Sequence, residues 1–198
     1  MASLLDVIIA TIAGMMVLFL ITTSLFNIQA INYNTQIQFN LSQMSEDLLT
    51  GKNINGTDYL GLETYLSKVG AGVPETTDPI IEATSNSFKF LGKTNSTSAI
   101  STFYLVQETA TIDGFPLYLY KDDMSNPTFG PFWLADPLAI TFYDVNENAI
   151  VNPNSDHSSI RSTEIELNFF HNTYQPDIDR RSISHTIVLW KYFQNLYL

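Results

Sequence analysis

The chain has 198 residues, contains no cysteine and carries a net charge of −11 at pH 7. The absence of cysteine excludes disulfides, thiolate catalysis and cysteine-based zinc sites. The 9 basic residues are scattered along the sequence without forming a patch or stripe, which argues against a nucleic-acid partner.

An uncharged apolar run from Val7 to Phe26 directly follows a carboxylate, Asp6. About twenty apolar residues are the length that a helix needs to cross the hydrocarbon core of a bilayer. We therefore predict a membrane-spanning helix over residues 2–26, rather than a buried helix of a soluble domain, which is usually shorter or has a polar face. A signal peptide fits less well, because no Lys or Arg precedes Lys52.

The helix is expected to continue beyond the apolar run with an amphipathic half, residues 27–49. Apolar residues there recur at spacings of four, four, three and four, which is one stripe of a helix: Tyr33, Ile37, Leu41, Met44 and Leu48. No proline interrupts residues 2–49, and the sequence TGKNING at Thr50–Gly56 supplies a stop signal. We predict one helix of about 45 residues, roughly 70 Å long.

Residues 50–198 are predicted to form a globular domain made mainly of strands. A short helix is expected within Tyr59–Gly70, where Leu62, Leu66 and Val69 share a face. Later segments rich in β-branched and aromatic residues are typical of strands: residues 86–92, 99–107, 115–121, 138–145, 159–170 and 182–193. No strand–helix–strand alternation appears after residue 75, so we predict an antiparallel sheet and an α+β fold. Large aromatic residues dominate small cores, and we expect Phe142 and Trp190 to be core anchors.

One loop has a partial calcium-binding pattern. Asp144, Asn146 and Asn148 stand at alternate positions, as in the first half of a calcium loop. Ala149 occupies the position of the required glycine, and Ser155 occupies that of the closing glutamate. A hairpin turn is therefore the favoured interpretation, with calcium binding as the alternative.

Signals for catalysis are weak, and we expect neither enzyme activity nor a cofactor. The sequence has no Gly-x-Ser-x-Gly elbow, and the histidines lie in separate segments without metal-ligand spacing: His157, His171 and His185. The acidic pairs Asp122/Asp123 and Asp177/Asp179 stand in polar loops and indicate solvated turns. Glycosylation motifs of low specificity occur at Asn40, Asn55 and Asn95.

The stretch SLLDVIIATIAGMMVLFLI, from Ser3 to Ile21, resembles the mature N-terminus of the type IV pilin and pseudopilin superfamily. In that family a few apolar residues precede an acidic residue, usually glutamate at the fifth position. Here the residue is Asp6, fifth from Ala2 and sixth from Met1, either of which could be the mature N-terminus. The later segments LADPLAITFYDVNENAIV and IRSTEIELNFF are more loosely similar to minor pseudopilins of the type II secretion J-like kind. The resemblance implies a pilin-like fold, with the long helix packed on the sheet.

The resemblance also implies a function, namely that of a structural subunit in a bacterial pilin-like filament. The helices would leave the inner membrane and bundle with other copies of the chain into a cell-surface or periplasmic filament. Asp6 would then face the protonated α-amino group of a neighbouring subunit, which offsets the cost of a carboxylate in apolar surroundings. The residues expected at assembly contacts are Ala2, Asp6, Ile8, Ile12, Gly14, Met15 and Phe19.

Two alternatives stay open. The chain could be a minor pseudopilin of a type II secretion system, which the sequence does not separate from a major pilin. It could instead be a single-pass membrane-anchored binding module that does not polymerise. In that case Asp6 would lie among lipid headgroups, favoured there by the dipole of the helix N-terminus.

Overall fold

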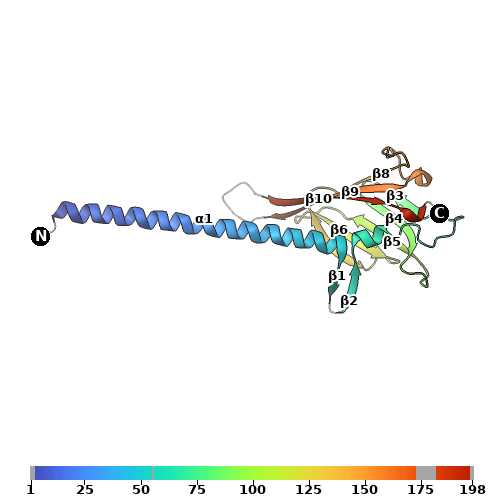
Figure 1. The fold of residues 1–198 in the computed structure, drawn as a ribbon, viewed down its shortest axis with the longest axis horizontal. Helices are drawn as coiled ribbons and strands as arrows, with labels where there is room; N and C mark the ends of the chain where they lie inside the picture. The colour runs from blue at the N-terminus through green and yellow to red at the C-terminus, as the bar shows by residue number, and fades with distance from the viewer. Residues whose placement is uncertain (1–2, 55, 173–181, 197–198) are drawn as a thin grey trace. The chain divides into compact units, whose positions relative to one another are not determined.

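The computed structural model describes residues 3–54, 56–172 and 182–196. Helix α1 spans Leu4–Thr50 and has 47 residues, so the predicted long helix is confirmed (Figure 1). The chain divides into two compact units, Met1–Asn40 and Leu41–Leu198. The last residues of α1 therefore belong to the same unit as the strands.

The amphipathic pattern is confirmed at this end of α1. Leu41 and Leu48 are buried and Met44 is half-buried, in agreement with the predicted stripe. Ser45 is buried beside them, and its hydroxyl donates a hydrogen bond to the carbonyl of Ser42 at 2.7 Å. Bonding back to the helix backbone satisfies this polar group inside an apolar contact.

The second unit is built on an antiparallel sheet with the strand order β10-β9-β7-β6-β5-β4-β3, and β8 also pairs with β9. The strands are β3 (Ile80–Ala83), β4 (Ser87–Lys93), β5 (Ile100–Gln107), β6 (Phe115–Lys121), β7 (Phe129–Leu134), β8 (Ala139–Tyr143), β9 (Ser162–Asn172) and β10 (Ser182–Tyr192). A separate antiparallel hairpin joins β1 (Gly51–Ile54) to β2 (Thr57–Leu60). The α+β fold class and the antiparallel pairing are thus confirmed.

The predicted segments and the observed elements differ at several places. All six predicted strands are present, but β3, β7 and the β1–β2 hairpin were not predicted. The short helix is present as α2 (Leu62–Leu66), and it is shorter than expected because Thr57–Leu60 pairs as a strand. Two single-turn 3-10 helices, η1 (His157–Ser159) and η2 (Gln194–Leu196), complete the described elements.

An aromatic cluster occupies the core of the second unit. The ring of Phe88 on β4 lies 5.0 Å from those of Phe90 and Phe142 and 5.7 Å from that of Phe193, measured between centroids. Helix α2 covers this side of the sheet, with Tyr65 in edge contact with Phe103 at 5.1 Å. These rings are all fully buried, so the unit has a complete core of its own.

The segment after α2 lies directly against β4. The amide of Gly70 donates to the carbonyl of Leu91 at 2.9 Å, and a Cβ added to Gly92 would lie 1.9 Å from the carbonyl oxygen of Lys68. Only glycine fits this approach of two backbones. Asn195 holds the turn that follows α2, because its side-chain amide donates to the carbonyls of Ser67 and Val69 at 3.0 and 3.1 Å.

The expectation that Trp190 anchors the core is wrong, whereas the expectation for Phe142 is confirmed. Phe142 is 1% exposed, but Trp190 is 41% exposed and stacks on Tyr143 with centroids 4.4 Å apart. Trp190 lies opposite Glu164 of β9, on the face of the sheet that points away from the core. Alternation along β10 places Trp190 on that outer face, and the sequence does not show which face is buried.

Candidate functional site

The most unusual surface of the first unit is its apolar helix. All residues from Ser3 to Gln36 are exposed in the single chain, including the entire run Val7–Phe26. By length and composition, α1 is the one helix among the described residues that could span a membrane. Contiguous apolar surface of this extent is not stable in water and requires lipid or other protein around it.

Four of the predicted assembly residues form one stripe on this helix. Ile8, Ile12, Met15 and Phe19 follow one another at spacings of four, three and four, and each is 47% to 71% exposed. Gly14 lies in open space, with no atom within 4 Å of an added Cβ. Such a stripe can insert between the side chains of a facing helix.

Polar groups within the apolar run bond to their own helix. The hydroxyls of Thr11, Thr22 and Thr23 each donate to the carbonyl four residues earlier, at 2.8 to 2.9 Å. A hydroxyl paired in this way does not need water. The three threonines are therefore compatible with an apolar environment.

Asp6 takes part in a capping box that sequence reasoning missed. Its Oδ2 atom accepts hydrogen bonds from both the amide and the hydroxyl of Ser3, each at 2.9 Å. The amide of Asp6 is 3.0 Å from the Ser3 carbonyl oxygen and 3.3 Å from the Ser3 hydroxyl. The signal was in the sequence, since Ser-x-x-Asp before an apolar run is a helix-start pattern. Ala2, the other residue expected near the assembly contact, lies outside the described residues.

The loop with the partial calcium pattern forms a tight turn, which confirms the favoured interpretation. Asp144 Oδ1 accepts hydrogen bonds from the amides of Asn146 and Asn148 at 2.8 and 2.9 Å, and Oδ2 accepts one from the Asn148 side chain at 3.1 Å. These hydrogen bonds lower the pKa of the Asp144 carboxyl, and the bonds from Asn148 have a larger effect than the bond from Asn146. Tyr143 and Ala149 pair across the turn. The carboxylate of Asp144 is thus used to hold the turn.

The other polar candidates are dispersed. His157 lies 3.3 Å from Asp78, between Nδ1 and Oδ2, while His185 is on β10 and the side chain of His171 lies outside the described residues. Within the described ranges, no three His, Asp or Glu side chains gather closely enough to hold a metal ion.

The remaining acidic pairs and glycosylation motifs are placed only in part. Asp122 and Asp123 accept hydrogen bonds from the amides of Thr102 and Ser125, at 2.9 and 2.8 Å, which fits the predicted turn. The residues of the pair Asp177/Asp179 lie outside the described residues. Among the motifs, Asn40 and Asn95 are exposed, and Asn55 also lies outside the described residues.

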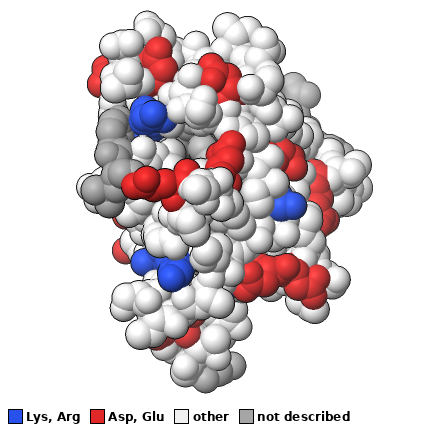
Figure 2. Space-filling model, turned by 90° about the vertical axis from the view of Figure 1, so that its right-hand side faces the viewer, with Lys and Arg blue, Asp and Glu red and all other residues white. Residues whose placement is uncertain are grey.

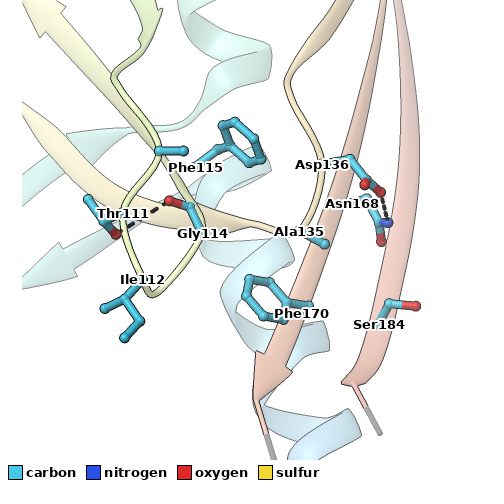
Figure 3. Close-up of a pocket in the computed structure, with 10 residues that line it drawn as sticks. Thr111, Ile112, Gly114, Phe115, Ala135, Asp136, Asn168, Phe170 and Ser184 are labelled. Carbon is cyan, nitrogen blue, oxygen red and sulfur yellow. Dashed lines mark hydrogen bonds between the residues drawn. The ribbon is translucent and has the colours of Figure 1, made fainter. Parts of the chain in front are cut away.

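A shallow hollow of about 530 Å³ opens beside strands β6, β9 and β10 (Figure 3). Its walls include Phe115, Phe170 and the loop residue Ile112, which is 86% exposed. Among the described residues of the wall, Asp136 is the one ionisable side chain, and it accepts a hydrogen bond from Asn168 at 2.6 Å. The volume is within the range of ligand sites, but the polar groups do not form a catalytic arrangement.

On the face drawn in Figure 2, the charged side chains do not converge on one site. Figure 2 shows acidic residues spread over one face of the molecule, with basic residues at a few isolated positions. This distribution agrees with the net charge of −11. It gives the molecule an acidic surface, which attracts basic partners more than acidic ones.

No protein-family model, no curated protein and no solved structure matches this chain.

Proposed function

We propose that the chain is a structural subunit of a bacterial pilin-like filament, assembled from the inner membrane through its N-terminal helix. The observation that carries the proposal is the difference between the two units. The second unit buries its own aromatic core, whereas Val7–Phe26 is exposed all round. A helix of this kind needs lipid before assembly and other helices after it.

The stripe of Ile8, Ile12, Met15 and Phe19 supports packing against neighbouring copies. Lipid tails are as apolar as these side chains, so the gain on assembly comes from close packing rather than from removal of water. Gly14, with open space around it, permits a close approach of helix backbones at the centre of the run. Bulk at this position should therefore weaken the packing.

Asp6 is proposed to pair with the α-ammonium group of a neighbouring subunit. Both of its side-chain hydrogen bonds end on Oδ2, and Oδ1 accepts none from residues 3–54, 56–172 and 182–196. A carboxylate can accept at both oxygens, so the capping box and a pairing between subunits are compatible. Removing one partner of a buried charge pair costs about 3–5 kcal/mol, enough to disrupt a polymer.

The capping box supplies a matched control for this role. Ser3→Ala removes the hydrogen bonds of the Ser3 hydroxyl, leaves the bond from the Ser3 amide and keeps the carboxylate. Asp6→Asn removes the charge, and Asp6→Glu keeps it. If Asp6 pairs between subunits, filament yield relative to membrane-bound protein should collapse in Asp6→Asn only. Equal loss in Ser3→Ala and Asp6→Asn would show that the carboxylate serves its own helix. Acetylation of the N-terminus should reproduce the Asp6→Asn result.

The hollow beside β6, β9 and β10 favours one alternative, a membrane-anchored binding module that does not polymerise. A minor pseudopilin of a type II secretion system is the other alternative, in which the chain joins a filament made mainly of another subunit. Electron microscopy of the native assembly separates the three. Filaments of this chain alone support the proposal, rare copies within another filament indicate the minor subunit, and dispersed membrane protein indicates the binding module.

A further inference from the structure

Strand β10 is an unusually open edge of the sheet. In the described part of the chain it pairs with β9 alone, over 11 residues, in a register that runs unbroken from Ser182↔Asn172 to Tyr192↔Ser162. It contains no proline, and Lys191 is its only Lys, Arg, Asp or Glu residue. Long, regular and mostly uncharged edges offer a template for another strand, and proteins usually block them.

The opposite edge, β3, is blocked in the usual ways. It has 4 residues, and its register with β4 shifts between Ile80 and Glu82. The side chain of Asn154 accepts a hydrogen bond from the amide of Ala83 at 3.2 Å. Shortness, an irregular register and a side chain on the backbone all prevent strand addition there. Strand β10, by contrast, has 11 residues, and its register with β9 shows no shift.

The register shows which β10 amides face outward. The amide of Phe193 donates to the carbonyl of Arg161 at 2.9 Å, which makes this pair hydrogen-bonded in the ladder. Hydrogen-bonded pairs alternate in antiparallel strands, so Lys191, Leu189 and Ile187 also bond to β9. The backbone groups of the alternate residues point to the free edge, and these residues include Ser184, Thr186, Val188 and Trp190.

The two faces of this edge differ in chemistry. Val188 and Trp190 are 61% and 41% exposed, and on the same face they lie opposite Glu166 and Glu164 of β9. On the other face, the half-buried Ile187 lies opposite the buried Leu167. The next pair on this face is the same, with the half-buried Leu189 opposite the buried Ile165. The apolar core therefore extends to the β10 edge, where its outermost side chains are only half covered.

We propose that β10 docks an extended strand of a partner protein in which basic and apolar residues alternate. The backbone of that strand would bond to Thr186, Val188 and Trp190, its basic side chains would lie on the Glu164 and Glu166 face, and its apolar side chains would close the core. The docked strand would lie beyond β10, two strand spacings or roughly 10 Å from β9. A lysine side chain of the docked strand and a glutamate side chain of β9 are together long enough to meet across β10.

A second copy of β10 fits this edge less well. In an antiparallel pair of two β10 strands, the residues whose backbone groups point outward would pair with each other. These residues, Thr186, Val188 and Trp190, carry their side chains on the face of Glu164 and Glu166, so the second copy would present the same three side chains to the carboxylates. None of these side chains is a cation, and Lys191 points to the other face. The charge of the edge thus favours a basic strand over self-pairing.

The test uses the full chain in detergent micelles and a blocked nine-residue peptide that alternates lysine and valine. When the peptide pairs antiparallel with β10, the lysine amides face β10 and the valine amides face solvent. N-methylation of the lysine amides should therefore weaken binding at least about tenfold, through loss of several backbone hydrogen bonds. N-methylation of the valine amides keeps the same charge and should leave the affinity within about threefold. Labelled-peptide anisotropy measures both.

Hydrogen exchange locates the peptide on the protein. Binding should slow the amides of Thr186, Val188 and Trp190 and leave those of Ile187 and Leu189, already in the ladder, unchanged. Val188→Pro removes an outward amide without removing a β9 hydrogen bond, and should weaken binding as the lysine methylation does. Val188→Thr retains the amide and should bind the peptide nearly as well as the unmodified chain.

Three results would overturn the proposal. The first is that the unmodified peptide fails to bind, and the second is that the two methylated peptides bind equally, which would indicate adsorption by charge alone. Alternatively, the protein without peptide could form dimers with the outward amides of β10 already protected, which would make a second copy the occupant. None of these results bears on the filament proposal, which rests on the N-terminal helix.

Discussion

Residues of the same chemical type meet opposite surroundings in the two units of this chain. Phe88 on β4 is 0% exposed, whereas Phe19 on α1 is 71% exposed. Ile165 and Ile12 differ in the same way, at 0% and 54%. The strand unit closes its core within one chain, and the apolar helix does not. Hydrophobicity thus identifies what must be covered, and only the structure shows whether the chain covers it itself.

Removal of the apolar helix segment should have the largest effect. Without Ala2–Phe26 the chain should lose membrane association and polymer formation completely, since the exposed apolar surface is gone. The far-ultraviolet circular dichroism of the sheet should persist, because the core residues all remain. Sedimentation of the fragment measures assembly, and a fragment that still polymerised would show that the helix is not the assembly element.

A pair of matched substitutions tests the contrast between the units directly. Phe88→Ala should lower the free energy of unfolding by about 3–5 kcal/mol, because it leaves a cavity among Phe90, Phe142 and Phe193. Phe19→Ala makes the same chemical change on the exposed helix and should leave the unfolding of the sheet unchanged. Chemical denaturation followed by near-ultraviolet circular dichroism provides both values. Equal losses would contradict the division into two units.

Trp190→Ala gives an intermediate effect that separates the two faces of the sheet. Trp190 is 41% exposed and its contact with Tyr143 is a surface ring pair, so the expected loss is about 1 kcal/mol. Phe142→Ala, on the opposite and buried face of the sheet, should lower the free energy of unfolding by about 3–5 kcal/mol. A loss for Trp190→Ala as large as that for Phe142→Ala would place the indole in the core after all.

The last effect is absent near neutral pH and develops only in alkaline solution. Burial, together with the 2.8 Å hydrogen bond to Glu108, raises the pKa of Tyr120 to about 12. An unfolded tyrosine ionises near pH 10, so between pH 10 and 12 the folded chain binds more protons than the unfolded chain. Stability should therefore fall as pH rises through this window. Tyr120→Phe should reduce that decline, and denaturation series from pH 9 to 12 test it.

The sequence predicted elements whose side chains alternate clearly, and it missed elements whose residues carry mixed signals. The alternation in β5 and β9 was sufficient to identify both strands. Strand β7 contains Gly130 and Pro131, which indicate a turn when only the sequence is considered. Strand β3 has only 4 residues, too few for a periodic pattern.

Candidate site residues were predictable where one helix contains the whole pattern. The stripe on α1 follows from spacing alone, and the bond between Ser3 and Asp6 is a local motif that a search for helix starts would have found. The exposure of Trp190 depends on β10 being the last strand of the sheet. Strand order is a long-range property that alternation within one segment does not encode.

The position of Phe193 in the core has a consequence for the living cell. Its ring packs on Phe88, more than 100 residues earlier in the chain, and its amide donates to the carbonyl of Arg161, the residue just before β9. At about 5–20 residues per second, a ribosome that has completed the apolar helix needs roughly 10–30 s more to produce this residue. During this time the apolar helix is complete while the aromatic cluster is still open, so a nascent chain exposes two apolar surfaces before the sheet can close.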